Sequence, residues 1–180
     1  MNEHVKVFKA LGEALSQVSI GNNICFKPKQ IQCFELLMKG HGVVSILPTG
    51  YGKSLIFQLL PWVLPQKTIG KANIVIVVCP LTSIIADQIT VLKKCGIKAV
   101  TLPNSWNEDF DQIFPALFPD SNEKEQSKPD FEPSNPTFAL LFAHPEALLS
   151  EKCRQLLKSK PFQERVVACA IDEVHCVEMW

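Results

Sequence analysis

The fold is decided by the stretch Ile46-Leu47-Pro48-Thr49-Gly50-Tyr51-Gly52-Lys53-Ser54, which predicts an apolar strand, a glycine-containing loop and the start of a helix. Gly50 and Gly52 allow the backbone to turn sharply, so that its N–H groups can point inward at a phosphate. Lys53 can reach the outer phosphates of a nucleotide, and the Ser54 hydroxyl can bind Mg²⁺. The positive end of the helix dipole adds to the attraction. The stretch therefore predicts a phosphate-binding loop.

The loop departs from the strict pattern G-x-x-x-x-G-K-[ST], because Leu47 stands where the first glycine belongs. A surface turn is the alternative interpretation. The flanking sequence favours the loop: residues 43–47 predict a buried strand, and residues 55–60 predict a helix with an apolar face. Pro61 and Pro65 are expected to end that helix. Strand, loop and helix thus follow in the order that a phosphate loop requires.

The composition predicts a globular protein with one core. The 180 residues suffice for a single domain, with 47% hydrophobic and 20% charged residues. The 18 basic and 18 acidic side chains cancel, so a polyanion would have to be bound by a local patch. The N-terminus lacks the signal-peptide pattern, and no apolar run has the length of a membrane span. Neither secretion nor a membrane partner is expected.

The cysteines are scattered, form no C-x-x-C pair, and several lie within apolar runs. This predicts reduced core thiols in a nuclear protein, or a cytoplasmic one if the source is prokaryotic, and it predicts neither disulfides nor a zinc site. The seven are Cys25, Cys33, Cys79, Cys95, Cys153, Cys169 and Cys176.

The hydrophobic pattern alternates between helices and strands, which predicts an α/β fold with a parallel sheet covered by helices. Helices are expected over residues 3–18, 28–38, 81–95 and 151–160, and strands over residues 72–79, 97–102, 137–142 and 166–171. Prolines interrupt residues 103–136, which are expected to form a long surface insertion with one short helix near 110–117. A domain boundary is the alternative, but the α/β pattern resumes directly afterwards.

Phe26-Lys27-Pro28-Lys29-Gln30 comes just before the predicted phosphate-loop strand. Pro28 suits the first turn of a helix, and the Gln30 amide can form paired hydrogen bonds with an adenine edge. The alternatives are that Phe26 is a core residue and that Gln30 is a solvated helix residue. The place in the sequence favours a role in nucleotide binding.

Asp172 and Glu173 stand at the end of the last predicted strand, where charge near an apolar core must be paired or bound to metal. Mg²⁺ supplies a reason for the pair: Asp172 can hold the ion, and Glu173 can orient and activate the attacking water. Ligands of open α/β sheets bind outside the carboxyl ends of the strands, where the phosphate loop would also lie. The two motifs together predict a nucleoside triphosphate site.

Five motifs carry a family resemblance: F-K-P-K-Q, L-P-T-G-Y-G-K-S-L-I-F-Q-L-L-P, C-P-L-T-S-I-I-A-D-Q, A-H-P-E-A-L-L and D-E-V-H-C-V-E-M-W. Their order resembles the first motor domain of RecQ-type DNA helicases of superfamily 2, over residues 24–180, with residues 1–23 as an N-terminal helix. The resemblance implies a RecA-like P-loop NTPase fold. Phosphate loops of this superfamily commonly lack the first glycine.

The resemblance implies ATP and Mg²⁺ as cofactors and single-stranded or forked DNA as partner. The adenine-recognising residues would be Phe26, Lys29 and Gln30, and the phosphate loop would be Thr49, Gly50, Tyr51, Gly52, Lys53 and Ser54. Lys53 and Glu173 would be catalytic, and Ser54 and Asp172 would bind Mg²⁺. Thr82, Ser83 and Gln88 would contact DNA, His175 would couple nucleotide state to DNA, and Trp180 would respond to single-stranded DNA.

The resemblance further implies a 3′-to-5′ helicase that couples ATP hydrolysis to unwinding in repair or recombination. The family's next motif strand would lie between the phosphate-loop and acidic-motif strands and would follow Trp180, so the domain is expected to be incomplete. Without the second RecA-like lobe, the chain alone is expected not to unwind DNA. A nucleotide-binding or interaction module without motor activity is the alternative, and an RNA-acting relative is a weaker one. Tyr51 departs from the family's usual glycine, which costs little if its φ stays negative.

Overall fold

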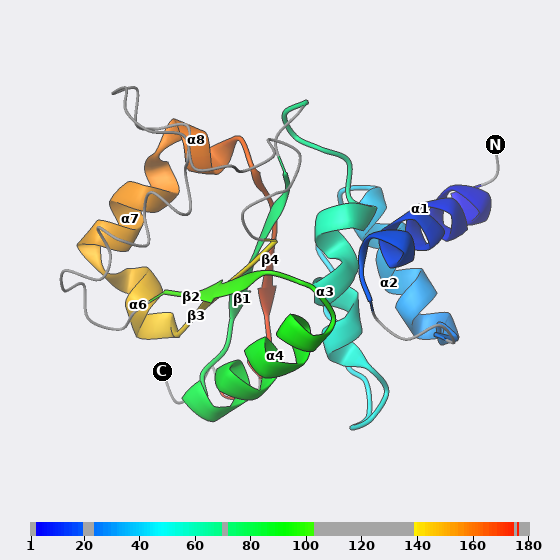
Figure 1. Ribbon diagram of the computed structural model, residues 1–180, viewed down its shortest axis with the longest axis horizontal. Helices are drawn as coiled ribbons and strands as arrows, with labels where there is room; N and C mark the ends of the chain where they lie inside the picture. The colour runs from blue at the N-terminus through cyan, green and yellow to red at the C-terminus, as the bar shows by residue number, and fades with distance from the viewer. Residues whose placement is uncertain (1–2, 20–23, 70–71, 103–138, 175, 177–180) are drawn as a thin grey trace.

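The computed structural model describes residues 3–19, 24–69, 72–102, 139–174 and 176 (Figure 1). Within these ranges lie four parallel strands in the order β2-β3-β1-β4. The strands are β1 (Ile74–Val78), β2 (Ala99–Thr101), β3 (Leu140–Ala143) and β4 (Val166–Ile171). The predicted insertion at 103–136, with its helix near 110–117, falls outside the described residues. The parallel α/β sheet is confirmed.

The sheet is covered by helices on both faces (Figure 1). α1 (Glu3–Gln17), α2 (Pro28–Met38), α3 (Lys53–Val63) and α4 (Thr82–Lys94) contribute to the core on one face. α6 (Pro145–Leu149), α7 (Glu151–Lys158) and α8 (Lys160–Gln163) cover the other. The helices expected at residues 3–18, 28–38 and 81–95 are therefore confirmed, and the one expected at 151–160 ends at Lys158.

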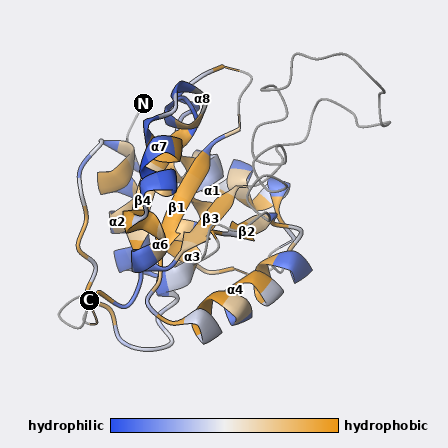
Figure 2. Cartoon of the chain, turned by 90° about the vertical axis from the view of Figure 1, so that its left-hand side faces the viewer, coloured by the Kyte–Doolittle hydropathy of each residue, from blue (hydrophilic) through white to orange (hydrophobic). Residues whose placement is uncertain are grey.

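β1 is an interior strand of this sheet, with β3 on one side and β4 on the other, and every one of its five residues is buried. Its side chains alternate between the two cores, as the period of a strand requires: Val75 and Val77 belong to the cluster under α1–α4, and Ile76 belongs to the cluster under α6–α8. Figure 2 shows the apolar colour running through the strands inside a more polar exterior. A continuous run of β-branched residues thus specifies a strand buried on both faces.

The helix after the phosphate loop is longer than the sequence predicted. α3 continues through Pro61 to Val63, so the expectation that Pro61 ends it is wrong. Pro61 lies in the last turn, where its missing N–H removes only one hydrogen bond, and Phe57 and Val63 are buried on either side. The side chain of Asn73, itself buried, donates to the carbonyls of Pro61 (3.0 Å) and Leu64 (2.9 Å) at the helix end.

The prediction of a strand at residues 43–47 is wrong, because this segment belongs to no strand or helix. Val44 is 85% exposed and Ile46 is 88% exposed, whereas Leu47 is buried. A strand needs a neighbour to satisfy its backbone, and in the described part of the chain no strand pairs with this segment. An apolar run shows what a strand can bury, but it does not show whether a partner strand lies beside it.

β4 is only half buried, which is less than its run of apolar residues predicts for a strand of this sheet. It pairs with β1 along one side, and among the described residues it has no strand on its other side. Cys169 and Ile171 are exposed as a result. β4 is therefore an edge strand in this sheet.

The thiols are free, but not all of them lie in the core. Cys33, Cys79, Cys153 and Cys176 are buried, Cys95 is half-buried, and Cys25 and Cys169 are exposed. The prediction of core thiols is therefore wrong for the last three. Over the ranges that the structure describes, every helix is too short or too polar to cross a membrane.

Candidate nucleotide-binding site

The site lies where three parallel strands end at the same level. Val78 of β1 is in register with Ala143 of β3 and with Ile171 of β4. The backbone N–H of Asp172 donates to the Val78 carbonyl (2.9 Å), which continues the β1–β4 ladder to the acidic pair. One strand over, the His144 Nε2 is hydrogen-bonded to the Pro80 carbonyl. This edge of the sheet is the place where open α/β folds bind ligands.

The loop between Leu47 and α3 has the backbone that the sequence predicted. Gly50 and Gly52 both adopt positive φ, at 74° and 87°. In the described part of the chain only Glu173 combines a side chain with a positive φ, so Tyr51 keeps the negative φ that makes its presence inexpensive. Gly52 is the N-cap of α3 and has no side chain to bind the first N–H groups of the helix. Those donors remain available to a ligand.

Gln30 ties this loop to the first turn of α2. Its side chain is only 2% exposed, and its Nε2 donates to the carbonyls of Tyr51 (3.2 Å) and Gly52 (2.9 Å). Its Oε1 accepts a hydrogen bond from the backbone N–H of Lys27 (2.8 Å), as the third helical residue does in a capping box. Both amide hydrogens are therefore engaged, and one lone pair of Oε1 is left for another donor.

Lys27 holds the neighbouring part of the loop. Its Nζ donates to the Gly50 carbonyl (3.1 Å) and lies 4.5 Å from the centre of the Tyr51 ring. A cation over an aromatic face contributes about 0.5–1 kcal/mol at an exposed site. The tyrosine at this position thus makes a contact that a glycine could not make.

These contacts orient the N–H groups of the loop. The carbonyls of Gly50, Tyr51 and Gly52 all point toward the start of α2. In a trans peptide the N–H of the next residue points the opposite way, and these peptides are trans. The N–H groups of Gly52 and Lys53 therefore point away from α2, whereas that of Tyr51 donates to the Pro48 carbonyl (3.2 Å). The loop presents backbone donors on the side away from Gln30.

The charge of Lys53, at the end of the loop, acts on the carboxyl of Asp172 in the acidic pair. Lys53 Nζ donates to the Leu47 carbonyl (3.4 Å). Burial raises the pKa of the Asp172 carboxyl above its usual value, and the charge of Glu173 raises it further. The backbone N–H of Glu173, which donates to Asp172 Oδ1 (3.1 Å), and the Lys53 ammonium lower that pKa in part. The Glu173 N–H and the Lys53 ammonium thus stabilise the ionised Asp172 carboxylate less than burial and the Glu173 charge destabilise it.

Glu173 has a left-handed backbone, with φ at 52°. Such a conformation costs a residue with a side chain about 1–2 kcal/mol. The turn is held by the β4 ladder before it and by the hydrogen bond from the Cys176 N–H to the Glu173 carbonyl (2.9 Å) after it. Strained residues of this kind gather at functional sites, so the strain agrees with a catalytic role for Glu173.

The chemistry of the side chains fits Mg²⁺. Ser54 supplies a hydroxyl and Asp172 a carboxylate, and Mg²⁺ prefers oxygen ligands while keeping several waters. The raised pKa of Asp172 marks a carboxylate that a nearby cation would stabilise. Among the described residues, no three histidine, cysteine or acidic side chains come close enough to form a protein-only metal site.

The other predicted site residues lie in varied surroundings. Phe26 packs edge-to-face on Phe34, with ring centres 6.0 Å apart. It is half-buried and packs against the core. Lys29 and Thr49 are exposed. Thr82 and Ser83, in the first turn of α4, are also exposed.

The predictions for three further residues have other outcomes. Gln88 donates to the Ser54 hydroxyl (3.1 Å), so it lies against the phosphate loop, and a contact with DNA stays untested. His175 and Trp180 fall outside the described residues.

The sequence did not single out Lys27 or Gln58. Lys27 had no signal beyond its place in F-K-P-K-Q, and only the fold brings it over Tyr51. Gln58 could have been noticed, because it is a polar residue within the apolar run that follows Ser54 in α3. Its Nε2 donates to the Gln88 Oε1 at 2.7 Å.

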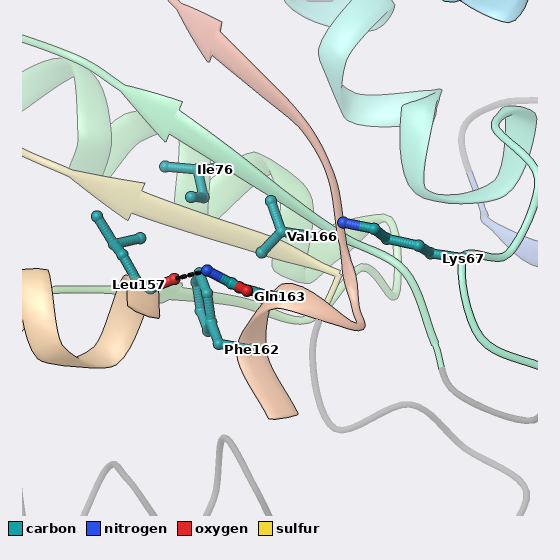
Figure 3. Close-up of a pocket in the computed structure, with 6 residues that line it drawn as sticks. All are labelled: Lys67, Ile76, Leu157, Phe162, Gln163 and Val166. Atoms are coloured by element: carbon teal, nitrogen blue, oxygen red, sulfur yellow. Dashed lines mark hydrogen bonds between the residues drawn. The ribbon is translucent and has the colours of Figure 1, made fainter. Parts of the chain in front are cut away.

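The structure also contains a shallow pocket of about 280 Å³ at the other end of β4 (Figure 3). It is lined by Ile76, Leu157, Phe162, Gln163 and Val166, with Lys67 at its side. Val166 begins β4 and Asp172 follows its last residue, so this pocket and the acidic pair lie at opposite ends of the strand. The pocket is therefore separate from the nucleotide-binding site.

A parallel sheet with a phosphate loop and an acidic pair at its carboxyl edge defines a P-loop nucleotide-binding domain. The family model described as DEAD/DEAH box helicase matches residues 27–180, and the chain belongs to that family. Members of this family use ATP and Mg²⁺.

The relatives of the chain are RecQ-type helicases, which confirms the resemblance. It is 28% identical over 156 residues to ATP-dependent DNA helicase Q1 of Pongo abelii, covering 86% of this chain and 21% of the relative. It is 33% identical over 174 residues to ATP-dependent DNA helicase Q-like 4B of Arabidopsis thaliana, covering 93% and 13%. RecQ-like DNA helicase blm-1 of Caenorhabditis elegans is 31% identical over 156 residues, covering 86% and 14%. The chain thus spans about a fifth or less of these relatives.

The two loop glycines should respond differently to substitution. Alanine at either position would be strained by the positive φ. Only at Gly52 would the new Cβ also lie 2.7 Å from the Gln30 Nε2. We expect Gly52→Ala to lower the free energy of unfolding by about 1–3 kcal/mol more than Gly50→Ala, because the buried Gln30 amide would lose its partners. Equilibrium urea unfolding measures the difference. Equal losses in the two variants would contradict the role of Gln30.

Asp172→Asn should stabilise the chain in the absence of metal and nucleotide. The folded-state pKa of Asp172 is raised above the ordinary 3.8, so the folded chain keeps the proton to higher pH than the unfolded chain. Stability therefore falls as pH rises through the interval between 3.8 and the folded-state pKa, and the loss persists at neutral pH. Urea unfolding at pH 7 should show a more stable variant, with the gain disappearing below pH 3.8.

Asp87→Asn is the control for this experiment, because Asp87 is exposed on α4. It is expected to change the free energy of unfolding little. A neutral-pH stability of Asp172→Asn equal to or below that of the wild type would show that burial of this carboxylate carries no cost.

Proposed function

We propose that the chain is the ATP-binding part of a RecQ-like ATP-dependent 3′-to-5′ DNA helicase that couples ATP hydrolysis to DNA unwinding in repair or recombination. The observation that carries this proposal is geometric: Gly50 and Gly52 at positive φ lead into α3, and Asp172 and Glu173 follow β4 at the carboxyl edge of the parallel sheet. The similar proteins include ATP-dependent DNA helicases, which supports the same function.

Each residue of the site has a proposed task in ATP hydrolysis. The N–H groups of Gly52 and Lys53 bind phosphate oxygens, and the Lys53 ammonium leaves the Leu47 carbonyl to neutralise charge on the outer phosphates. Ser54 and Asp172 would hold Mg²⁺, which neutralises phosphate charge when bound. Glu173 orients the attacking water and takes its proton.

DNA binding is proposed for the start of α4. Thr82 and Ser83 are exposed there and follow β1 at the same edge of the sheet as the nucleotide site. Hydroxyls and backbone N–H groups suit contacts with phosphates of the DNA backbone, which position a strand without reading its sequence. Unwinding is proposed for this lobe acting with a second lobe, because closure of two lobes on ATP completes such a site.

The nucleotide site is tested by Lys53→Ala in the 180-residue chain. We expect the affinity for Mg·ATP to fall about tenfold or more, because a charge-assisted hydrogen bond contributes about 1.5–3 kcal/mol and 1.4 kcal/mol corresponds to tenfold. Isothermal titration calorimetry measures the affinity. The control is Lys93→Ala in the last turn of α4, which also removes one positive charge from an exposed position.

Equal affinities of wild type and Lys53→Ala would refute the assignment of the phosphate loop. ATP binding without DNA-stimulated hydrolysis, measured in the presence of a second lobe from a relative, would instead favour a nucleotide-binding module without motor activity.

A further inference from the structure

Three side chains form a continuous hydrogen-bonded relay between α3, α4 and the phosphate loop. The Nε2 of Gln58 donates to the Oε1 of Gln88 at 2.7 Å, and the Nε2 of Gln88 donates to the Oγ of Ser54 at 3.1 Å. Gln58 lies four residues after Ser54, so both side chains project from the same face of α3. Gln88, on α4, closes the space between them.

The Gln58 side chain is a polar group in an apolar part of the core. Gln58 is buried, and its neighbours Ile56, Phe57, Leu59 and Leu60 are buried hydrophobic residues. A buried amide without a partner costs about 1–3 kcal/mol, so its presence here depends on the bond to Gln88. In turn, that bond holds the Gln88 amide in one orientation, with its N–H directed at Ser54.

The orientation of the Ser54 hydroxyl matters for metal binding. A hydroxyl has two lone pairs and one hydrogen to donate. Gln88 occupies one lone pair, which leaves the second lone pair for a cation and the hydrogen for another acceptor. Mg²⁺ demands nearly ideal octahedral geometry, so a hydroxyl held in a single orientation is a better ligand than a rotating one.

We propose that Gln88 is a positioning residue that orients the Ser54 hydroxyl for Mg²⁺, with Gln58 as its anchor. This inference rests on the proposed nucleotide site. Gln88 lies on α4, the helix whose first turn carries Thr82 and Ser83.

Gln88→Met tests the proposal, because methionine keeps the length of the side chain but can neither donate to Ser54 nor accept well from Gln58. The measurement is binding of ADP to the 180-residue chain by calorimetry, once with a series of Mg²⁺ concentrations and once in EDTA. We expect the Mg²⁺ concentration for half-maximal enhancement of ADP binding to rise about tenfold or more, as for other partners of metal ligands. Binding in EDTA is expected to stay unchanged.

Two further variants sharpen the test. Gln58→Met removes only the anchor and should shift the Mg²⁺ dependence in the same direction by a smaller factor. Gln32→Met makes the same change at an exposed position of α2 and should leave the Mg²⁺ dependence unchanged.

The outcomes separate this inference from the proposed function. Binding of ADP by the wild type, with an unchanged Mg²⁺ dependence in Gln88→Met, would overturn the inference and leave the nucleotide site in place. An equal loss of affinity with and without Mg²⁺ would assign Gln88 a packing role and would also overturn it. Failure of the wild type to bind ADP would overturn both.

Discussion

The site depends on the buried amide of Gln30, which holds the backbone of the phosphate loop against α2. Two glycines at positive φ give the loop its turn, but ordering them is costly, because glycine loses more conformational freedom on folding than any other residue. The bonds from Gln30 to the Tyr51 and Gly52 carbonyls, together with that from Lys27 to Gly50, offset this cost. The N–H groups of Gly52 and Lys53 are available to a ligand because the Tyr51 and Gly52 carbonyls are held by Gln30.

The acidic pair, Asp172 and Glu173, lowers the stability of the chain when no ligand is bound. Burial raises the pKa of Asp172, and Glu173 adopts a left-handed backbone. Neither feature favours the chain without its ligands, and both are expected where a cation and a triphosphate bind. The Lys53 ammonium compensates Asp172 only in part, which leaves room for the charge that Mg²⁺ would bring.

Much of this could be predicted from the sequence, because the decisive signals are local. The run of β-branched residues in β1 specifies a strand buried on both faces, and Gly50 and Gly52 specify the loop backbone. The strand predicted at residues 43–47 failed, since pairing depends on a neighbour that periodicity does not reveal. The contacts of Lys27 and Gln88 also escaped prediction, because only the fold brings distant side chains together.

The role of the loop N–H groups in nucleotide binding is measured most directly by a titration of the ¹⁵N-labelled chain with Mg·ADP, followed through the backbone amide resonances. The largest shifts are expected at Gly52 and Lys53, whose N–H groups point away from Gln30. A smaller shift is predicted at Tyr51, whose N–H is already bonded to the Pro48 carbonyl. Largest shifts at Phe162 and Val166, beside the pocket at the far end of β4, would show that the nucleotide does not bind at the phosphate loop.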